Sequence, residues 1–387
     1  MTKPSIVSPD DQNVTFVELF FDLVFVFAVT QTVGLLHGEV HAASVGRAVL
    51  VFWLVWWAWT QFTWALNAAD TTHAGVQLTT LVATAVAFFM AIALPQAFGD
   101  RAIWFAIPYV LVRTTGLVLY MRVAAAAGPG QHRAVRTFGT LSVGGLAAVV
   151  AGGIAGGDTQ YWLWAMAILL DVVAATVGAQ SDEWDLHPSH FVERHGLFVI
   201  IALGETLIVA AGGAVGASWD IATLAVAILA VTVTCALWWT YFPRAKARLD
   251  EAMESLRGAA LSEAARDAFS LIHFPMLCGI VAVAVTVEAA VAHPHEPLDI
   301  ASRAILASGL VLFVGGTAAA VWRATGTWLV PRLVATSVTA VAITALPGLS
   351  PAVTLGMAAA GTALVAAVEH SSGRVHSTIG AARSDAR

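Results

Sequence analysis

The sequence predicts an all-α fold, a polytopic membrane helix bundle with about twelve transmembrane helices. Of the 387 residues, 58% are apolar and only 11% are charged, whereas a soluble domain carries about 25% charged residues. Long apolar runs recur along the chain, and a spanning helix needs roughly 20 mostly apolar residues. Too few charges are available to cover the surface of a water-soluble protein of this length, so the lipid bilayer is the expected surrounding.

The apolar runs end at polar residues or at Gly and Pro, which set the limits of the predicted helices. The first run carries two acidic residues and has no small-residue cleavage site, so it is predicted to be a retained helix rather than a signal peptide. The last two runs are rich in Ala, Gly and Thr and are joined by a tight turn between Pro347 and Pro351. The predicted spans are 15–36, 47–67, 75–98, 102–125, 135–155, 160–179, 191–213, 220–243, 268–292, 301–323, 328–347 and 350–369.

The distribution of Lys and Arg predicts that both termini are cytoplasmic. With about twelve spans, nearly all basic residues fall on one side of the membrane, and only Arg47, Arg101 and Arg303 fall on the other. An excess of Lys and Arg is typical of the cytoplasmic segments of multi-pass proteins. The longest of these segments, 244–267, has the pattern of a short amphipathic helix, and residues 371–387 are predicted to form a disordered cytoplasmic tail.

Two similar segments about half a chain apart predict an internal repeat. Thr-Phe-Val-Glu at 15–18 corresponds to His-Phe-Val-Glu at 190–193, and the Trp-Trp pair at 56–57 corresponds to the pair at 238–239. Six helices in each half would give both halves the same orientation, as in parallel-repeat transporters. The alternative is a chance recurrence of apolar letters. The predicted domains are an N-terminal six-helix membrane repeat over 1–180 and a C-terminal six-helix membrane repeat over 181–370.

Ionisable residues inside the predicted spans are the candidate functional residues, because a charge at the bilayer centre costs about 2.5–3.5 kcal/mol on insertion scales. Glu18 and Asp22 lie on one face of the first helix, about 6 Å apart along its axis. Two carboxylates this close repel each other, so one holds a proton or the pair shares a cation. The alternative for Glu18 is a structural role as an acidic residue in the first turn of its helix.

The seventh predicted helix carries Glu193, Arg194 and His195 near its beginning and Glu205 about 18 Å further along the axis. This distance places Glu205 well inside the hydrocarbon, where a carboxylate is a functional candidate. Gly204 beside it allows a close approach by a neighbouring backbone. Glu205 is therefore a candidate site of ion or proton coupling.

Arg113 in the fourth predicted helix and Asp171 in the sixth both fall near the middle of their spans. Arg113 keeps its proton and needs a carboxylate partner, for which Asp171, Glu205 and Asp22 are the candidates. The pair is either a static link or a clamp for an anionic substrate. His273 begins the ninth predicted helix, and since His titrates near pH 6.5 it is either a proton relay or a hydrogen-bonded structural residue.

Several patterns are absent from the sequence. It has no Walker A loop that would indicate ATP, no Ser-His-Asp, HExxH or CxxC pattern, and no basic-aromatic patch that would indicate nucleic acid. Cys235 and Cys278 lie in apolar runs, which predicts buried thiols rather than a disulfide or a metal site. The acidic loop at 182–185, followed by His187 and His190, has no recognised ligand spacing. No metal and no cofactor are predicted.

Three segments resemble the motifs of the bacterial low temperature requirement A family. They are Glu18-Leu-Phe-Phe-Asp-Leu-Val-Phe-Val-Phe-Ala28, His190-Phe-Val-Glu-Arg-His-Gly-Leu-Phe-Val-Ile-Ile-Ala-Leu-Gly-Glu205 and His273-Phe-Pro-Met-Leu-Cys-Gly-Ile280. The resemblance covers nearly the whole chain and implies a multi-pass protein of the bacterial inner (plasma) membrane. It implies no reaction. It selects as motif positions Glu18, Asp22, Glu193, Arg194, His195, Glu205 and His273.

Three functions follow as hypotheses. The first, which the helix number, the repeat and the carboxylates inside the spans favour, is a proton- or ion-coupled secondary transporter of a small-molecule or ion substrate. The second is an intramembrane enzyme acting on a lipid or isoprenoid, with the acidic and His residues near the cytoplasmic face as general acids and bases. The third is a non-catalytic membrane stress-response component with static ion pairs. The sequence specifies no substrate, coupling ion or oligomeric state.

Overall fold

Helices make up nearly the whole chain in the computed structural model, which describes residues 5–9, 12–36, 41–178, 184, 186–215 and 217–384. Within these residues the only extended pairing is an isolated bridge between Val7 and Ala69. Three short segments, labelled η, are not α-helical: Leu94–Gln96 is a 3-10 helix, and Tyr241–Lys246 and Ala265–Leu271 are π-helical. The elements are α1 (Phe16–Gly34), α2 (Ala42–Ala68), α3 (Ala74–Ala93), η1 (Leu94–Gln96), α4 (Ala102–Ala127), α5 (Pro129–Ala155), α6 (Gly157–Gly178), α7 (Pro188–Val215), α8 (Ile221–Thr240), η2 (Tyr241–Lys246), α9 (Ala247–Ser255), α10 (Gly258–Ala264), η3 (Ala265–Leu271), α11 (His273–Ala292), α12 (Ile300–Thr325), α13 (Val330–Ala345) and α14 (Pro351–Ser384).

Ten helical segments of the described chain are long and apolar enough to cross a membrane. They correspond to the first ten predicted spans, so the all-helical, multi-span architecture predicted from composition is confirmed. The last two predicted spans correspond to shorter apolar helices, Val330–Ala345 and Pro351–Ala367. The number of about twelve spans and the cytoplasmic position of both termini therefore stay predictions.

Large apolar side chains are exposed on helices of both halves of the chain. Phe89 on α3 is 63% exposed and Ile154 on α5 is 73% exposed, and Ile228 on α8 and Val338 on α13 are exposed as well. A soluble monomer seldom exposes large contiguous apolar patches. Outward-facing side chains of this kind suit contact with hydrocarbon, which agrees with the membrane assignment.

The chain folds into two compact units. Unit 1 comprises Met1–Ile201 and Asp250–Phe274, and unit 2 comprises Ala202–Leu249 and Pro275–Arg387. This division differs from the predicted domains because the segments 181–201 and 250–274 are grouped with the N-terminal helices. A compact unit need not be a repeat, so the six-plus-six repeat stays a prediction.

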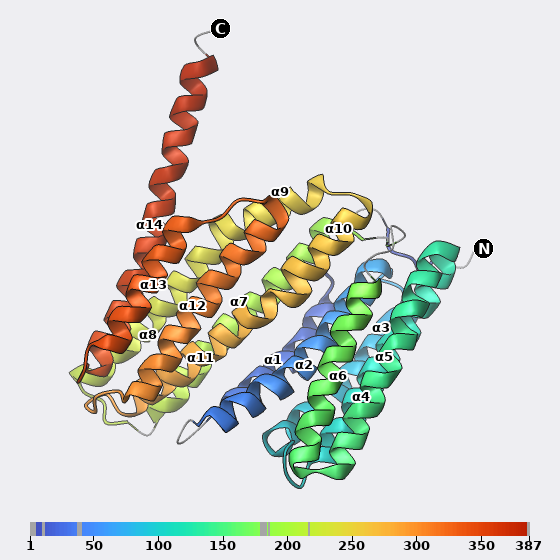
Figure 1. The fold of residues 1–387 in the computed structure, drawn as a ribbon, viewed down its shortest axis with the longest axis horizontal. Helices are drawn as coiled ribbons and strands as arrows, with labels where there is room; N and C mark the ends of the chain where they lie inside the picture. The colour runs from blue at the N-terminus through green and yellow to red at the C-terminus, as the bar shows by residue number, and fades with distance from the viewer. Residues whose placement is uncertain are drawn as a thin grey trace. The chain divides into compact units, whose positions relative to one another are not determined.

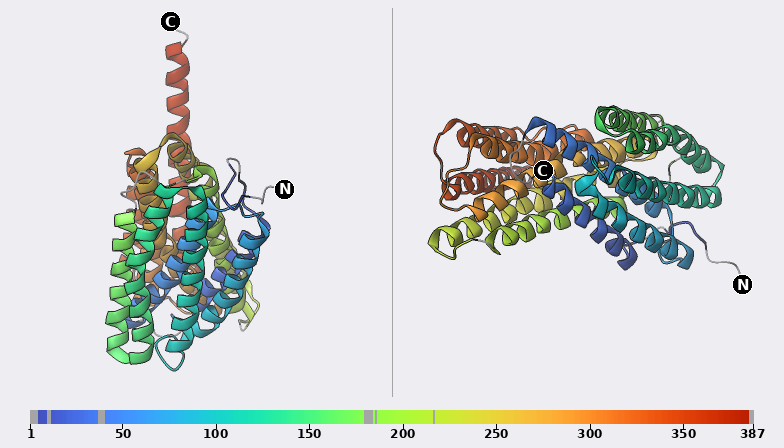
Figure 2. Two further views of the ribbon diagram at one scale, coloured as in Figure 1. Left: turned by 90° about the vertical axis from the view of Figure 1, so that its right-hand side faces the viewer. Right: turned by 90° about the horizontal axis from the view of Figure 1, so that it is seen from below.

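In unit 1, α5 packs along α4 and α6, α4 also packs against α2 and α3, and α1 packs against α2 and α3. Figures 1 and 2 both show α4, α5 and α6 running side by side. Between α5 and α6 the chain reverses at Gly156 and Gly157, whose φ angles are 64° and 54°. This left-handed conformation suits glycine, which has no Cβ to clash, and it lets the two helices pack along their length.

Helix α2 is the most deeply buried helix of unit 1. Between Val51 and Ala69 nearly every residue is buried. Its polar side chains Thr60, Gln61 and Asn67 are buried as well. Buried polar groups need hydrogen-bond partners inside the protein, so α2 collects polar contacts from several neighbouring helices.

The segment before α1 is tied to the end of α2. The backbone N–H of Ser8 donates to the carbonyl of Ala68 at 2.9 Å, and the N–H of Asp70 donates to the carbonyl of Ile6 at 2.9 Å. Thr15 then caps α1, because its backbone N–H and hydroxyl both donate to a Glu18 carboxylate oxygen at 2.9 Å. These contacts fix where α1 begins and hold Glu18 in its first turn.

The segment between α8 and α11 is helical throughout most of its length. The amphipathic helix predicted at 244–267 corresponds to the end of η2, α9, α10 and the start of η3. Helix α11 begins at His273 rather than at 268, because the π-helical η3 occupies the positions before it. A π-helix interrupts the regular ladder of hydrogen bonds and often marks a functional position.

In unit 2, α13 packs against α12 and α14, and α14 packs against α8. Helices α11 and α12 meet backbone to backbone. A Cβ atom added at Gly279 would lie 2.7 Å from the carbonyl oxygen of Gly309, and one added at Gly309 would lie 2.9 Å from that of Gly279. Such close approach is typical of small residues between membrane helices.

Asp220 caps the N-terminus of α8. The side chain of Asp220 accepts from the backbone N–H of Thr223 at 2.9 Å, and its other carboxylate oxygen lies 2.7 Å from His295 Nε2. The N–H of Thr223, and then His295, lower the pKa of Asp220 to about 2. An anion at a helix N-terminus is favourable, so this cap stabilises the start of α8.

Helix α14 continues to Ser384, through most of the segment 371–387 for which the sequence predicts a disordered tail. In Figure 1 this C-terminal part, in red, extends beyond its neighbouring helices.

Candidate functional site

The central feature of unit 1 is a buried cluster in which one guanidinium bridges two carboxylates. Arg194 on α7 donates from Nη1 to Glu18 Oε1 at 2.6 Å and from Nη2 to Asp22 Oδ1 at 2.7 Å. The side chains of Glu18 and Asp22 project from successive turns of α1, and all three side chains are fully buried. The repulsion between Glu18 and Asp22 was predicted to be relieved by a proton on one of them or by a shared cation. In the structure the two carboxylates share the Arg194 guanidinium.

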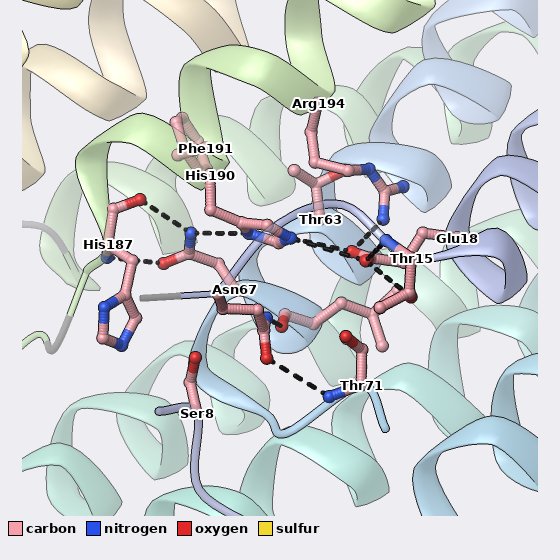
Figure 3. A network of polar contacts seen from close by, with 12 residues as sticks. Ser8, Thr15, Glu18, Thr63, Asn67, Thr71, His187, His190, Phe191 and Arg194 are labelled. Carbon is pink, nitrogen blue, oxygen red and sulfur yellow. Dashed lines mark hydrogen bonds and ion pairs between the residues drawn. The ribbon is translucent and has the colours of Figure 1, made fainter. Parts of the chain in front are cut away.

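Both carboxylate oxygens of Glu18 are bound. One accepts from Arg194, and the other accepts from Thr15 at the start of α1. His190, one turn before Arg194 on α7, lies 3.1 Å from Glu18 Oε1. Glu18 therefore has both the capping role and the ion-pairing role that its position predicts, and Figure 3 shows these groups converging on it.

His190 connects the cluster to the end of α2. Asn67 Nδ2 lies 3.1 Å from His190 Nδ1 and also donates to the carbonyl of His187 at 2.9 Å. Because an amide nitrogen can only donate, His190 Nδ1 is the acceptor and its Nε2 carries the proton that points to Glu18. Figure 3 shows His190 lying between Asn67 and Glu18.

Asp22 is bound less completely than Glu18. Its Oδ1 accepts from Arg194 and from the indole N–H of Trp59 at 2.7 Å. Its Oδ2 has no hydrogen-bond partner within the described residues, and the same holds for Arg194 Nε. With both acids ionised, the two carboxylates and one guanidinium carry a net charge of −1. Uptake of one proton or one cation would make the cluster neutral.

Trp59 links this cluster to a pair of buried histidines. The Arg194 guanidinium lies 5.6 Å from the centre of the Trp59 ring, whose other neighbours include His195 at 5.1 Å. The rings of His195 and His273 are 5.6 Å apart and are enclosed by aromatic side chains, among them that of Phe269. A cation near an indole ring is stabilised by the ring electrons, so Trp59 stabilises the Arg194 guanidinium. The same ring packs edge-on against His195.

The two histidines share one hydrogen-bonding pattern. His195 Nδ1 lies 2.9 Å from the carbonyl of Phe191, and His273 Nδ1 lies 2.7 Å from the carbonyl of Ala268. A carbonyl only accepts, so each Nδ1 carries a proton and each neutral ring keeps the lone pair on Nε2. His195 Nε2 is buried without a hydrogen-bond partner in the described part of the chain.

A second ion pair in unit 1 joins α4 and α6. Arg113 donates to both Asp171 oxygens, at 3.1 and 2.9 Å, and both side chains are buried. Arg113 also donates to the hydroxyl of Tyr109 at 2.7 Å and, from Nε, to Gln61 of α2. Of the three predicted partners, Asp171 is the one that binds Arg113. Because the Arg113 guanidinium already donates to Asp171, Tyr109 and Gln61, these contacts favour a structural link over a clamp for a substrate.

Two candidates lie apart from these clusters. Glu193 is exposed although its neighbours in sequence are buried, because it occupies the opposite face of α7. Glu205 is buried in unit 2, at 4% exposure. Outside its chain neighbours and its own helix backbone, no described atom would come within 4 Å of a Cβ at Gly204, so the close backbone approach that Gly204 allows is not made there by the described residues.

Three contributors to the cluster were not selected from the sequence: Trp59, Asn67 and His190. Local spacing contains a signal for one of them. Positions 59, 63 and 67 share one face of α2, and positions 190 and 194 share one face of α7. A polar residue on the same face as a buried charge is a candidate partner, and this test would have found His190 beside Arg194. The face of α2 with Trp59 and Asn67 carries no charged residue, so the test does not select them.

No group of three or more His, Cys, Asp or Glu side chains is placed to hold a metal ion in the part of the chain that the structure describes. Residues 182, 183 and 185 of the acidic loop lie outside that part. The backbone of His187 and the ring of His190, which follow the loop, both bind Asn67. The prediction that the protein takes no metal or cofactor stays a prediction.

Comparison with known proteins gives a match over nearly the whole chain. A family model described as bacterial low temperature requirement A protein matches residues 13–367. The uncharacterized protein RA0937 of Rhizobium meliloti (strain 1021) is 28% identical over 317 residues, which cover 80% of this chain and 77% of that protein. Every candidate residue, from Glu18 to His273, lies inside the matched range.

Proposed function

The chain belongs to the bacterial low temperature requirement A protein family, and from this premise we propose that it is a proton-coupled secondary transporter in which Asp22 exchanges the coupling proton. Membership and ten apolar helices make it a multi-span helical membrane protein. The transported substrate is a small molecule or ion, and Glu205 is the second candidate for a coupling carboxylate.

The observation that carries the proposal is that both carboxylate oxygens of Glu18 accept hydrogen bonds whereas only one oxygen of Asp22 does so within the described residues. Both oxygens of Glu18 accept hydrogen bonds, so a proton on either one would displace a donor. Asp22 can take a proton on Oδ2 and keep both bonds to Oδ1. Protonation of Asp22 therefore costs no existing contact and brings the cluster to neutrality, the charge that a membrane interior favours.

The same proton changes how firmly α1 and α7 are joined. With Asp22 ionised, its bond from Arg194 is charge-assisted, and such bonds are roughly twice as strong as neutral ones. With Asp22 protonated, that bond weakens while the bond from Arg194 to Glu18 persists. A protonation that loosens one link between two helices is a means of coupling proton binding to helix movement.

Proton binding is tested directly by infrared difference spectroscopy of the purified protein between two pH values. We expect a carboxyl C=O band that titrates in the wild type and in Glu18→Gln and that is missing in Asp22→Asn. A band that persists in Asp22→Asn would assign the proton to another group.

Coupling is tested in proteoliposomes that contain a pH-sensitive dye, with a panel of small solutes added outside. We expect a solute that moves protons in the wild type to move none in Asp22→Asn. Glu193→Gln is the matched control, since it removes an exposed acid from α7, and it should transport like the wild type. Unchanged proton movement in Asp22→Asn would refute the coupling role of Asp22.

The second candidate function is an intramembrane enzyme that acts on a lipid or isoprenoid. It is favoured by the lone pair of His195 Nε2 within an aromatic enclosure, an arrangement suited to a general base. Incubation with a bacterial lipid extract and mass spectrometry would then reveal a product that His195→Ala does not make. If Asp22→Asn and His195→Ala lower only the thermal stability, both functions give way to a non-catalytic membrane component.

A further inference from the structure

Helices α3 and α4 form the walls of an open groove on the surface of unit 1. The two helices pack along each other and run in opposite directions, because only the short segment 94–101 connects them. The groove between them has a volume of about 370 Å³, which lies within the range of small-molecule sites, about 300–1,000 Å³. No residue of the Glu18–Arg194 cluster lines it, so the groove is a separate feature.

One wall of the groove is a single face of α4. The residues that line it are Thr114, Thr115, Val118, Leu119 and Arg122. They recur at spacings of three and four residues, which is the pattern of one stripe along a helix. From Thr114 to Arg122 this stripe is about 12 Å long at the helical rise. The wall therefore has a cationic end at Arg122 and ends at the two short threonine side chains.

The opposite wall, on α3, is mainly apolar and faces outward. Leu78 is 64% exposed and Val82 is 51% exposed. Thr79, which also lines the groove, donates its hydroxyl to the carbonyl of Gly75 at 2.8 Å, so that hydroxyl is already bonded. Across the groove, Val118 is 46% exposed. Both helices are long and apolar enough to cross a membrane, so these outward-facing side chains suit contact with lipid chains.

Arg122 places a positive charge at one end of this apolar groove. Its side chain is exposed, and its guanidinium makes no hydrogen bond or ion pair within the described residues. Arg113 on the same helix differs, because it is buried and bound by Asp171. An Arg near the end of a spanning helix reaches the headgroup region while its hydrocarbon stem lies on apolar surface. The donors of the Arg122 guanidinium are therefore available to an anion.

We propose that this groove binds an anionic membrane phospholipid, with the phosphate at Arg122 and one acyl chain between α3 and α4. Arg binds phosphate by several hydrogen bonds, whereas the cationic group of a zwitterionic headgroup would be repelled by Arg122. The predicted topology, with both termini cytoplasmic, places the Arg122 end at the cytoplasmic face, where anionic lipids attract basic side chains. This site goes beyond the proton site at Asp22 and does not depend on it.

The test titrates the full-length protein in detergent micelles with palmitoyl-oleoyl phosphatidylglycerol or with the phosphatidylcholine of the same chains, and native mass spectrometry measures the bound lipid. We expect saturable binding of phosphatidylglycerol with an affinity about fivefold or more above that of phosphatidylcholine. Equal affinities would overturn the anionic headgroup, and the absence of a saturable adduct would overturn the site. A dimer of the chain that excludes lipid would assign the groove to a second copy and would also refute the proposal.

Paired variants locate the binding. Arg122→Gln should bring the affinities for the two lipids to within about twofold of each other, whereas Arg136→Gln, which removes an exposed Arg from α5, should keep the preference. Thr115→Phe fills the groove and should abolish the saturable adduct, while Val143→Phe, an exposed position on α5, should keep it. Equal losses in the two Arg variants would reveal attraction to net charge alone and refute the proposal, and this comparison still decides should Thr115→Phe not fold.

Discussion

Replacement of Arg194 by Gln is the perturbation that the buried cluster makes most informative. The side chain makes two short charge-assisted bonds, at 2.6 and 2.7 Å, to Glu18 and Asp22, and no atom of the three side chains reaches solvent. The variant leaves two carboxylates facing each other without their cation. It also removes the ionic tie between α1 and α7.

The expected cost follows from both bonds. Breaking a buried pair by removing one partner costs about 3–5 kcal/mol, and two hydrogen bonds to charged groups at about 1.5–3 kcal/mol each give a similar sum. Since each 1.4 kcal/mol is about a tenfold change, the unfolded fraction should rise by roughly two to four orders of magnitude. The measurement is the free energy of reversible unfolding in detergent micelles with a denaturing detergent as titrant.

Two further variants separate this explanation from a general loss of packing. Arg122→Gln removes an exposed Arg from α4 and should change the free energy of unfolding by less than about 0.5 kcal/mol. Asp22→Asn combined with Arg194→Gln should recover part of the loss, because only one buried carboxylate then lacks a cation. The reasoning fails if Arg194→Gln costs less than about 1 kcal/mol, or if the two losses simply add.

Three other results are expected. Tyr109→Phe should lower the free energy of unfolding by about 1.5–3 kcal/mol, since it removes a hydrogen bond to the buried Arg113 guanidinium, and a negligible change in the same detergent titration would contradict that bond. For Asp220 the pKa of about 2 lies below its ordinary value, so its contribution to stability is present above about pH 4 and is lost as pH falls towards 2. The melting temperature of Asp220→Asn should therefore fall less between pH 5 and pH 2 than that of the wild type, and equal falls would contradict the assignment. Gly279→Ala should cost about 1–3 kcal/mol because its Cβ meets backbone atoms, while Gly315→Ala, where no described atom lies within 4 Å, should be tolerated, and equal unfolding curves for both would refute the close helix contact.

The features that the sequence predicts best depend on contacts within one helix. Composition and apolar runs predict a multi-span helical protein because lipid demands long apolar helices whatever their packing. The shared face of Glu18 and Asp22 follows from helical spacing alone. Arg113 must find a carboxylate because it keeps its charge, and Asp171 was among the three candidates.

The remaining features depend on how distant helices are aligned. Arg194 satisfies Glu18 and Asp22 only because α7 lies beside α1 in one register, and nothing local in either helix specifies that register. The segment 250–274 joins unit 1 through contacts such as that of Trp64 with Ser270, which no hydropathy pattern reveals. Glu193 illustrates the same limit, since its motif position predicted a site residue and its helix face directs it outward.

Helix α2 reaches both carboxylates of the cluster. Trp59 donates to Asp22, while Asn67 binds His190, whose ring lies 3.1 Å from Glu18. A lipid or ligand that bound one position of α2 more tightly than another would therefore change the affinity of Asp22 for its proton. Thermodynamic linkage makes such an effect reciprocal, so proton binding at Asp22 would change the affinity for that ligand by the same factor.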